Sequence, residues 1–246
     1  MQTFGRIGND AEIKAGIGAN DVGAFLRLGK SVVVSDGWPV SGDSVSLGNN
    51  TSVFDVFANN LSKGSGVIIR GTTGTPVLPL TAPFCPIPTI TCGSTPVTLL
   101  PGESRTLAPG AYGTLSMPNG TSLTLTGGTY SFCSIRTGRN VTINVEGAGN
   151  STINVLGDVR FANGSFFGPT GSTLTPILNV AGHVLRIGAG TTVRAFISAP
   201  DAVLSMGRGA HVIGTFCVER TRSDKHIILE CPPDTIIPSA EGAFLE

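Results

Sequence analysis

The stretch Leu28-Gly-Lys-Ser-Val-Val-Val34 is followed, 19 residues further on (28 to 47), by Leu47-Gly-Asn-Asn-Thr-Ser-Val53. Each copy has an apolar anchor, a glycine, two variable residues, a residue that is usually small, one further residue and a second apolar residue. The same unit occurs at Ile7–Ile13, Ile187–Val193 and Met206–Val212. One copy would be uninformative in a glycine-rich chain, but five copies at similar spacing indicate a repeat architecture.

Weaker copies begin at Met117, Ile135 and Phe161. Most steps between successive anchors are 18 to 21 residues, for example 7 to 28 and 187 to 206, and two steps are 26 residues, 135 to 161 and 161 to 187. A constant step with occasional longer loops is typical of a solenoid in which every turn repeats one supersecondary unit. We therefore expect the anchors to pile up inside one column: Ile7, Leu28, Leu47, Met117, Ile135, Phe161, Ile187 and Met206.

These features predict an all-β fold, a single-stranded parallel β-helix that is right-handed rather than left-handed; a jelly roll or sandwich is the alternative. Val, Ile and Thr dominate the straight pieces, as strands prefer. The glycine after each anchor is expected at a corner whose backbone conformation disfavours a β-carbon. Residues 52–61 could form a short helix, but the repeat register favours a strand.

The repeats divide the chain into four parts. Residues 1–72 form N-terminal rungs, and 97–230 form the main solenoid. Residues 73–96 are rich in proline and are expected to be an excursion or linker. Residues 231–246 are expected to be an irregular tail that caps the last rung or docks on a neighbour.

Composition excludes several classes of protein. Charged residues make up 13% of the chain, against about 25% in an average soluble protein. The formal net charge is zero, with no run of basic residues and few aromatics, so nucleic acid is not an expected partner. No apolar run is long enough to span a bilayer. The N-terminus has no basic-then-apolar pattern, so we do not expect a secretion signal within these residues.

Five cysteines lie at positions 85, 92, 133, 217 and 231. Cys85 and Cys92 bracket a proline-rich segment and are expected to staple it as a disulfide. Cys217 and Cys231 are expected to close a second loop, and the fate of Cys133 stays open. A zinc site is the alternative, but CxxC spacing is absent and the histidines are scattered. Disulfides would imply an extracellular or cell-surface location.

Three further stretches carry a resemblance to a family. Leu107-Ala-Pro-Gly-Ala-Tyr-Gly113, Leu123-Thr-Leu-Thr-Gly-Gly-Thr-Tyr130 and Ile197-Ser-Ala-Pro200 resemble bacterial cell-surface β-solenoid domains over roughly residues 105–218. The N-terminal rungs are similar to the polymer-forming solenoids of bactofilins. The resemblance implies a right-handed parallel β-helix, an extracytoplasmic setting and a scaffolding or adhesive role, and it brings no catalytic residues.

No catalytic site, cofactor or metal is expected from the sequence. Polysaccharide lyases and hydrolases need clustered acids, and the repeats place no acids at matching positions except Asp36 and Asp55. We interpret these two acids as solvated turn residues. The alternative is that they stack on each other and that a bound cation relieves the repulsion between their like charges. His211 is interpreted as a surface histidine, and no G-x-S-x-G nucleophile motif occurs.

The expected function is therefore a structural or adhesive surface module. It would associate with itself through its open ends, or with other surface proteins or glycans. A carbohydrate-binding or carbohydrate-cleaving solenoid is one alternative. An ice-binding solenoid is another, because Thr51, Thr121 and Thr191 share the fifth repeat position and aligned threonines can order water.

Overall fold

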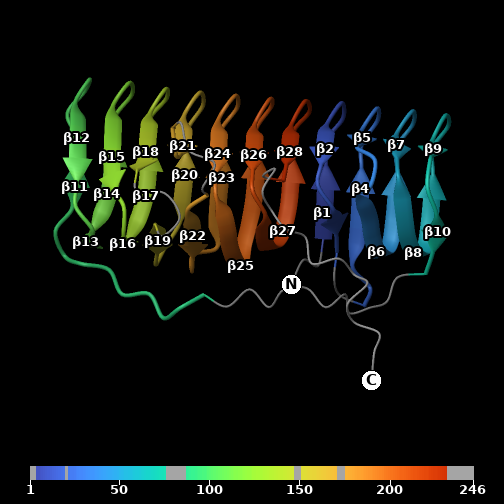
Figure 1. The fold of residues 1–246 in the computed structure, drawn as a ribbon, viewed down its shortest axis with the longest axis horizontal. Helices are drawn as coiled ribbons and strands as arrows, with labels where there is room; N and C mark the ends of the chain where they lie inside the picture. The colour runs from blue at the N-terminus through green and yellow to red at the C-terminus, as the bar shows by residue number, and fades with distance from the viewer. Residues whose placement is uncertain (1–3, 20–21, 76–86, 147–150, 171–174, 232–246) are drawn as a thin grey trace.

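The computed structural model describes residues 4–19, 22–75, 87–146, 151–170 and 175–231. All regular structure in these segments is β-strand, arranged in two sheets of 17 and 11 strands. Every strand pairing is parallel, and the strands stack as about eleven turns of one solenoid (Figure 1). The predicted parallel β-solenoid is confirmed.

A full turn has three strands, which we assign to a first, a second and a third face in chain order. The first face contains β11 (Val97–Thr98), β14 (Thr114–Met117), β17 (Ser134–Thr137), β20 (Val159–Phe161), β23 (Val184–Ile187), β1 (Phe4–Ile7) and β4 (Phe25–Leu28). The second face contains β12 (Ser104–Leu107), β15 (Ser122–Thr126), β18 (Thr142–Glu146), β21 (Phe166–Gly168), β24 (Thr192–Arg194), β26 (His211–Ile213), β28 (Ile228–Glu230), β2 (Glu12–Lys14), β5 (Val33–Val34), β7 (Ser52–Val53) and β9 (Ile68–Ile69).

The third face contains β13 (Gly110–Ala111), β16 (Thr129–Phe132), β19 (Thr152–Val155), β22 (Ile177–Val180), β3 (Ile17–Gly18) and β10 (Thr73–Gly74). Four long strands continue from the third face into the first: β25 (Phe196–Met206), β27 (Phe216–Ser223), β6 (Pro39–Leu47) and β8 (Asp55–Lys63). The strand expected over residues 52–61 is confirmed, since β7 and β8 occupy this stretch.

The order of the turns does not follow the order of the chain. β1 pairs with β27, and β2 pairs with β28, so the first turn of the chain lies directly on the last one. The N-terminal turns therefore extend the stack beyond its C-terminal turn and end at β9 (Figure 1). The other end of the stack is β11 and β12, which residues 87–96 approach along the lower edge in Figure 1.

Two runs of turns separated by a linker were expected; within the described residues, one strand ends at Gly74 and the next begins at Val97. The linker, however, joins opposite ends of one continuous stack rather than neighbouring turns. The proposed tail lies outside the described residues beyond Cys231.

One corner of every turn sets the repeat. The second repeat position is a glycine because the neighbouring turn comes too close: a β-carbon on Gly48 would lie 2.5 Å from the carbonyl carbon of Gly29. The left-handed backbone that we expected at this glycine occurs instead two residues later, for example at Asn50 with a φ of 56°. At this corner, one residue per turn has this conformation: Asp10, Ser31, Asn50, Gly66, Gly102, Gly120, Asn140, Gly164, Gly190, Gly209 and His226.

Side chains at this corner also join successive turns. The Oδ1 atom of Asn49 accepts a hydrogen bond from the backbone N–H of Ser65 in the next turn, at 3.1 Å. Asn9, Asn119 and Asn163 do the same at the third repeat position. The asparagines thus supply acceptors for backbone donors that lie outside the strands, where the sheets provide no partner.

The core is a set of stacked columns, and most predicted anchors share one of them. Leu28 pairs with Leu47, and Ile187 with Met206. Ile135 does not belong to this column, because Met117 lies opposite Thr137 while Ile135 lies between Leu115 and Val159. Strands have a period of two, so an error of two residues keeps a side chain on the inner face. Ile135 is accordingly buried, but in the neighbouring column.

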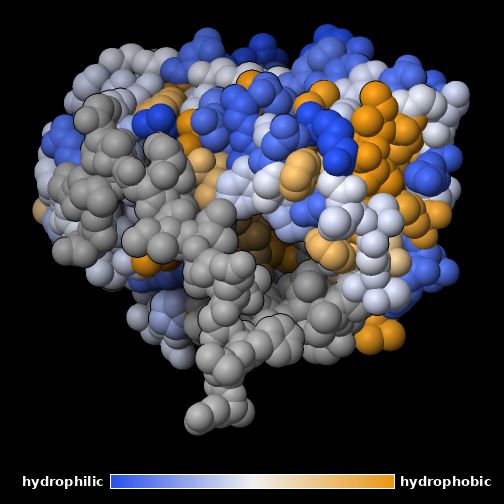
Figure 2. All heavy atoms as spheres, turned by 45° about the vertical axis from the view of Figure 1, so that its right-hand side comes forward, coloured by the Kyte–Doolittle hydropathy of each residue, from blue (hydrophilic) through white to orange (hydrophobic). Residues whose placement is uncertain are grey.

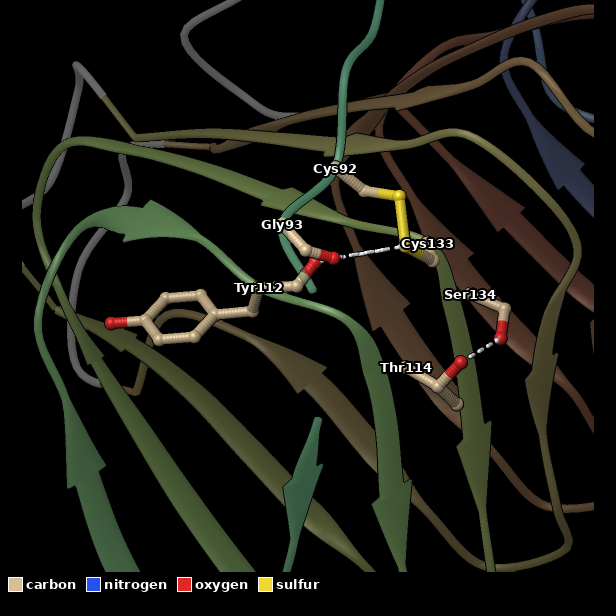
Figure 3. Close-up of a disulfide and its surroundings, with 6 residues drawn as sticks. All are labelled: Cys92, Gly93, Tyr112, Thr114, Cys133 and Ser134. Atoms are coloured by element: carbon tan, nitrogen blue, oxygen red, sulfur yellow. Dashed lines mark hydrogen bonds between the residues drawn. A yellow bond between two sulfur atoms is a disulfide. The ribbon is translucent and has the colours of Figure 1, made fainter. Parts of the chain in front are cut away.

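Both predicted cysteine pairs are wrong. Cys92 is bonded to Cys133, 41 residues away, and not to Cys85, which lies outside the described residues. Cys231 is a free thiol, and Cys217 is disulfide-bonded to a partner outside the described residues. Figure 3 shows Cys92 above Cys133, whose Sγ lies 3.4 Å from the carbonyl oxygen of Gly93. The stacking of turns, and not distance along the chain, brings the two cysteines together.

We predict that Gly48→Ala lowers the free energy of unfolding by about 2 kcal/mol, because the new methyl group overpacks the backbone of Gly29. Gly16→Ala is the matched control, since its β-carbon would meet only side-chain atoms of Pro39 and Trp38 at 3.6 Å or more. Urea unfolding measures both. Equal stabilities of the two variants would contradict the close approach of the turns.

We also predict that replacing Cys92 and Cys133 with serine destabilises the protein by about 4 kcal/mol, because the bond closes a loop of 41 residues in the unfolded chain. The control is Cys231→Ser, which removes a thiol but no crosslink. Thermal unfolding without reductant compares them. A double variant as stable as the parent protein would count against this disulfide.

Candidate functional site

The candidate site is a row of outward-pointing side chains on the first face. One residue per turn lies in register along this row, immediately before the anchor position of the repeat, which is apolar in most turns. From one end of the stack to the other, the row reads Thr98, Ser116, Arg136, Arg160, Arg186, Ser205, Arg222, Arg6, Arg27, Ser46 and Ser62. Only arginine, serine and threonine occur in it.

Six arginines occupy six of seven consecutive turns in the middle of this row, and we call them the arginine column: Arg136, Arg160, Arg186, Arg222, Arg6 and Arg27. They are half of the twelve arginines in the chain. All six are exposed. The column crosses the junction between the two ends of the chain, because Arg222 lies opposite Arg6.

Strand alternation explains why these side chains point outward. In β1, β4 and β23 the residue before the arginine and the anchor after it are both buried, while the arginine between them is exposed. Strands of a parallel sheet lie about 4.8 Å apart. Successive guanidinium groups therefore start from positions spaced by this distance, and the whole column is about 30 Å long.

Little negative charge compensates the column. Asp158 forms an ion pair with Arg160 at 3.1 Å, and within the described residues the other five arginines form none. Like charges on directly opposite strand positions destabilise a sheet. Folding alone therefore does not favour six arginines here, and an anionic ligand would explain them.

A hollow interrupts the column at Ser205. The short serine side chain lies between Arg186 and Arg222, and Phe4, Arg6 and Asp224 are among the other residues that line an open depression with a volume of about 880 Å³. A smaller hollow of about 180 Å³ lies further along, where Arg6 and Arg27 lie near Lys30. Both hollows thus lie on the arginine column.

An aromatic pair flanks the column. Phe4 and Phe25 point outward two residues before Arg6 and Arg27, and their rings stack with centroids 5.9 Å apart. Both rings are partly exposed. They form a small apolar platform beside the guanidinium groups.

Among the described residues, the acids and histidines singled out in the sequence are not brought together in one cluster. Asp36 pairs with Arg70 at 3.1 Å, and Asp55 accepts hydrogen bonds from Thr72, so each acid has a protein partner of its own. His211 contacts Glu230 on the next strand at 3.1 Å. Within the described segments, no group of three or more His, Cys, Asp or Glu residues could hold a metal ion.

The threonines that suggested ice binding point inward. Thr51, Thr121 and Thr191 are buried, and each hydroxyl donates to a backbone carbonyl oxygen. They fill the crowded inner corner, as expected for small residues, and cannot form a surface ladder.

Sequence reasoning missed the arginine column, although a signal was present. Arginine directly precedes the anchor in Arg6-Ile7, Arg27-Leu28 and Arg186-Ile187. Reading the residue before each anchor, and not only the unit after it, would have revealed the row. After Arg136 and Arg222 the anchor position holds Thr137 and Ser223, which are not apolar. These two arginines can therefore be assigned to the row only from the strand register of the structure.

We predict that Arg6→Gln raises the free energy of unfolding by up to about 1 kcal/mol at low salt, because it removes repulsion from Arg222 and Arg27. The gain should vanish in high salt, which screens exposed charges. Arg139→Gln at an exposed corner is the control. Urea unfolding at both salt concentrations measures the effect, and an equally large loss of stability in both would show that Arg6 supports the fold instead.

The chain was compared with protein-family models, with characterised proteins and with solved structures. None of these three comparisons finds a match. Function therefore has to follow from the chemistry of the arginine column and its surroundings.

Proposed function

We propose that this protein is a non-catalytic adhesive module of the cell surface or extracellular space, and that it makes contact through its first face. The observation that carries the proposal is the single in-register row of arginine, serine and threonine along eleven turns. Such a row repeats one chemical group at a constant interval. That arrangement suits attachment to an extended partner better than recognition of one small molecule.

A further feature supports this role. The Cys92–Cys133 disulfide is compatible with an oxidising compartment. On the side shown in Figure 2, hydrophilic and hydrophobic residues are interspersed. Among the described residues, no helix is long and apolar enough to cross a membrane.

Carbohydrate cleavage is less well supported than carbohydrate binding. Cleavage needs two acids, or an acid and a base, at one site. Around the Ser205 hollow the lining residues include Asp224 as the one acid, beside Arg186, Arg222 and Arg6. Binding needs only complementary groups, and these are present.

Association through the ends remains a prediction, and each end carries a charge that disfavours it. Lys63 follows Leu47 in its core column at one end, and Arg105 precedes Leu123 at the other. Arg105 is paired with Glu103 at 2.7 Å. Charged side chains on edge strands oppose pairing with a second copy. Sedimentation velocity over a range of concentrations distinguishes a monomer from a filament.

The adhesive role predicts that beads coated with the oxidised protein are retained on at least one immobilised surface glycan or surface protein, without cleavage of the layer. Beads coated with reduced, denatured protein are the control, because they carry the same composition without the aligned row. Retention under flow and the release of new reducing ends are measured together. Absence of retention on every layer, or release of new ends, would overturn the proposal.

A further inference from the structure

We infer that the arginine column is a binding site for a linear acidic polysaccharide, which lies along the long axis of the stack and across its turns. This inference rests on the adhesive function proposed above and names its ligand. The column offers planar guanidinium groups, which can hold carboxylate or sulfate groups through two parallel hydrogen bonds. A periodic row of such groups calls for a polymer with periodic acidic groups.

The geometry sets the direction of the polymer. Each of the six arginines lies in a different turn, and all six occupy the same position within their turn. They therefore define a line perpendicular to the strands. This line is about 30 Å long. An extended acidic polysaccharide carries one acidic group on each sugar ring or on each disaccharide, so a chain along this line meets successive guanidinium groups.

The Ser205 hollow gives the site a seat at its centre. Arg186 and Arg222 flank the hollow along the column, and Arg6 adds a third guanidinium group at its wall. Asp224 at the margin is the opposing charge. An acidic group bound between three arginines would be held more firmly than one on the open face, because it is partly removed from water.

The aromatic pair favours a sugar chain over other polyanions. The stacked rings of Phe4 and Phe25 lie next to Arg6 and Arg27, where the apolar face of a sugar ring can rest while its acidic group reaches the column. Single-stranded nucleic acid instead requires aromatic side chains for successive bases. Duplex nucleic acid requires a broad basic surface, whereas this column is one residue wide in a chain of zero net charge.

The first test measures binding of the full, oxidised chain by calorimetry. The probes are a polygalacturonate fragment, a heparin fragment, a neutral glucan of equal length and single-stranded DNA of equal charge. The variant is Arg186→Gln, Arg222→Gln and Arg6→Gln combined. The matched control removes three exposed charges at corners outside the column: Arg139→Gln, Arg208→Gln and Lys225→Gln.

The inference predicts that polygalacturonate, heparin or both bind, with no binding of the neutral glucan. The column variant should lose about tenfold or more in affinity, as the loss of a charge-assisted hydrogen bond commonly produces, and the control should change far less. Tighter binding of DNA than of both glycans, or equal losses in variant and control, would overturn it. If beads still adhere in the flow assay while both acidic glycans fail to bind, the adhesive function stands and only the ligand is wrong.

A second variant separates shape from charge. Ser205→Trp fills the hollow without changing the net charge, and it should weaken binding of the acidic glycan several-fold. Ser62→Trp is the control, because it lies in the same row at the end of the stack, next to Ser46 and not to an arginine. Equal affinities of the two variants, with both folded by circular dichroism, would show that the hollow does not seat an acidic group.

Discussion

Close backbone stacking of each turn on the next is the constraint on which this structure depends. Parallel hydrogen bonds fix the spacing of the turns at about 4.8 Å, and at the corner after the first face this spacing excludes a side chain directed at the next turn. Gly48 has no room for a β-carbon against Gly29. Two residues later the chain turns in a left-handed conformation in every turn. The repeat unit in the sequence therefore reflects the residue types that this corner accepts.

Because of the same constraint, residues at one repeat position lie along a line on the surface. Once the corner fixes the register, the residue before each anchor must point outward in every turn, and its neighbours along the stack must be its counterparts in other turns. A residue type that recurs at one repeat position of the sequence thus forms a column along the stack. For apolar residues the result is a continuous core, and for arginine it is a row of charge that is compensated only at Arg160 among the described contacts.

The two ends of the stack differ from its middle, because a solenoid has unpaired strands at both ends. This protein places Lys63 and Arg105 at core positions there. At one end it also ties the incoming segment to the second turn through Cys92 and Cys133. The charged ends disfavour pairing with a second copy, in line with the proposed contact through the first face.

The sequence by itself determined the solenoid, its step and most of its core, because stacking selects apolar anchors and corner residues within each turn. Leu28 over Leu47 and Ile187 over Met206 follow from the repeat alone. Ile135 was assigned to the wrong column, since a shift of two residues preserves the inward direction and leaves no mark in an alternating pattern.

Only the tertiary structure decided the order of the turns, the cysteine pairs and the arginine column. Every turn presents similar backbone edges, so local sequence cannot specify that Phe4–Ile7 stacks on Phe216–Ser223. That junction brings Arg222 beside Arg6 and joins two short rows into one. Cys133 likewise meets Cys92 through stacking across 41 residues. Which turns lie next to each other along the solenoid axis is decided when the stack assembles. Distance along the chain does not determine it.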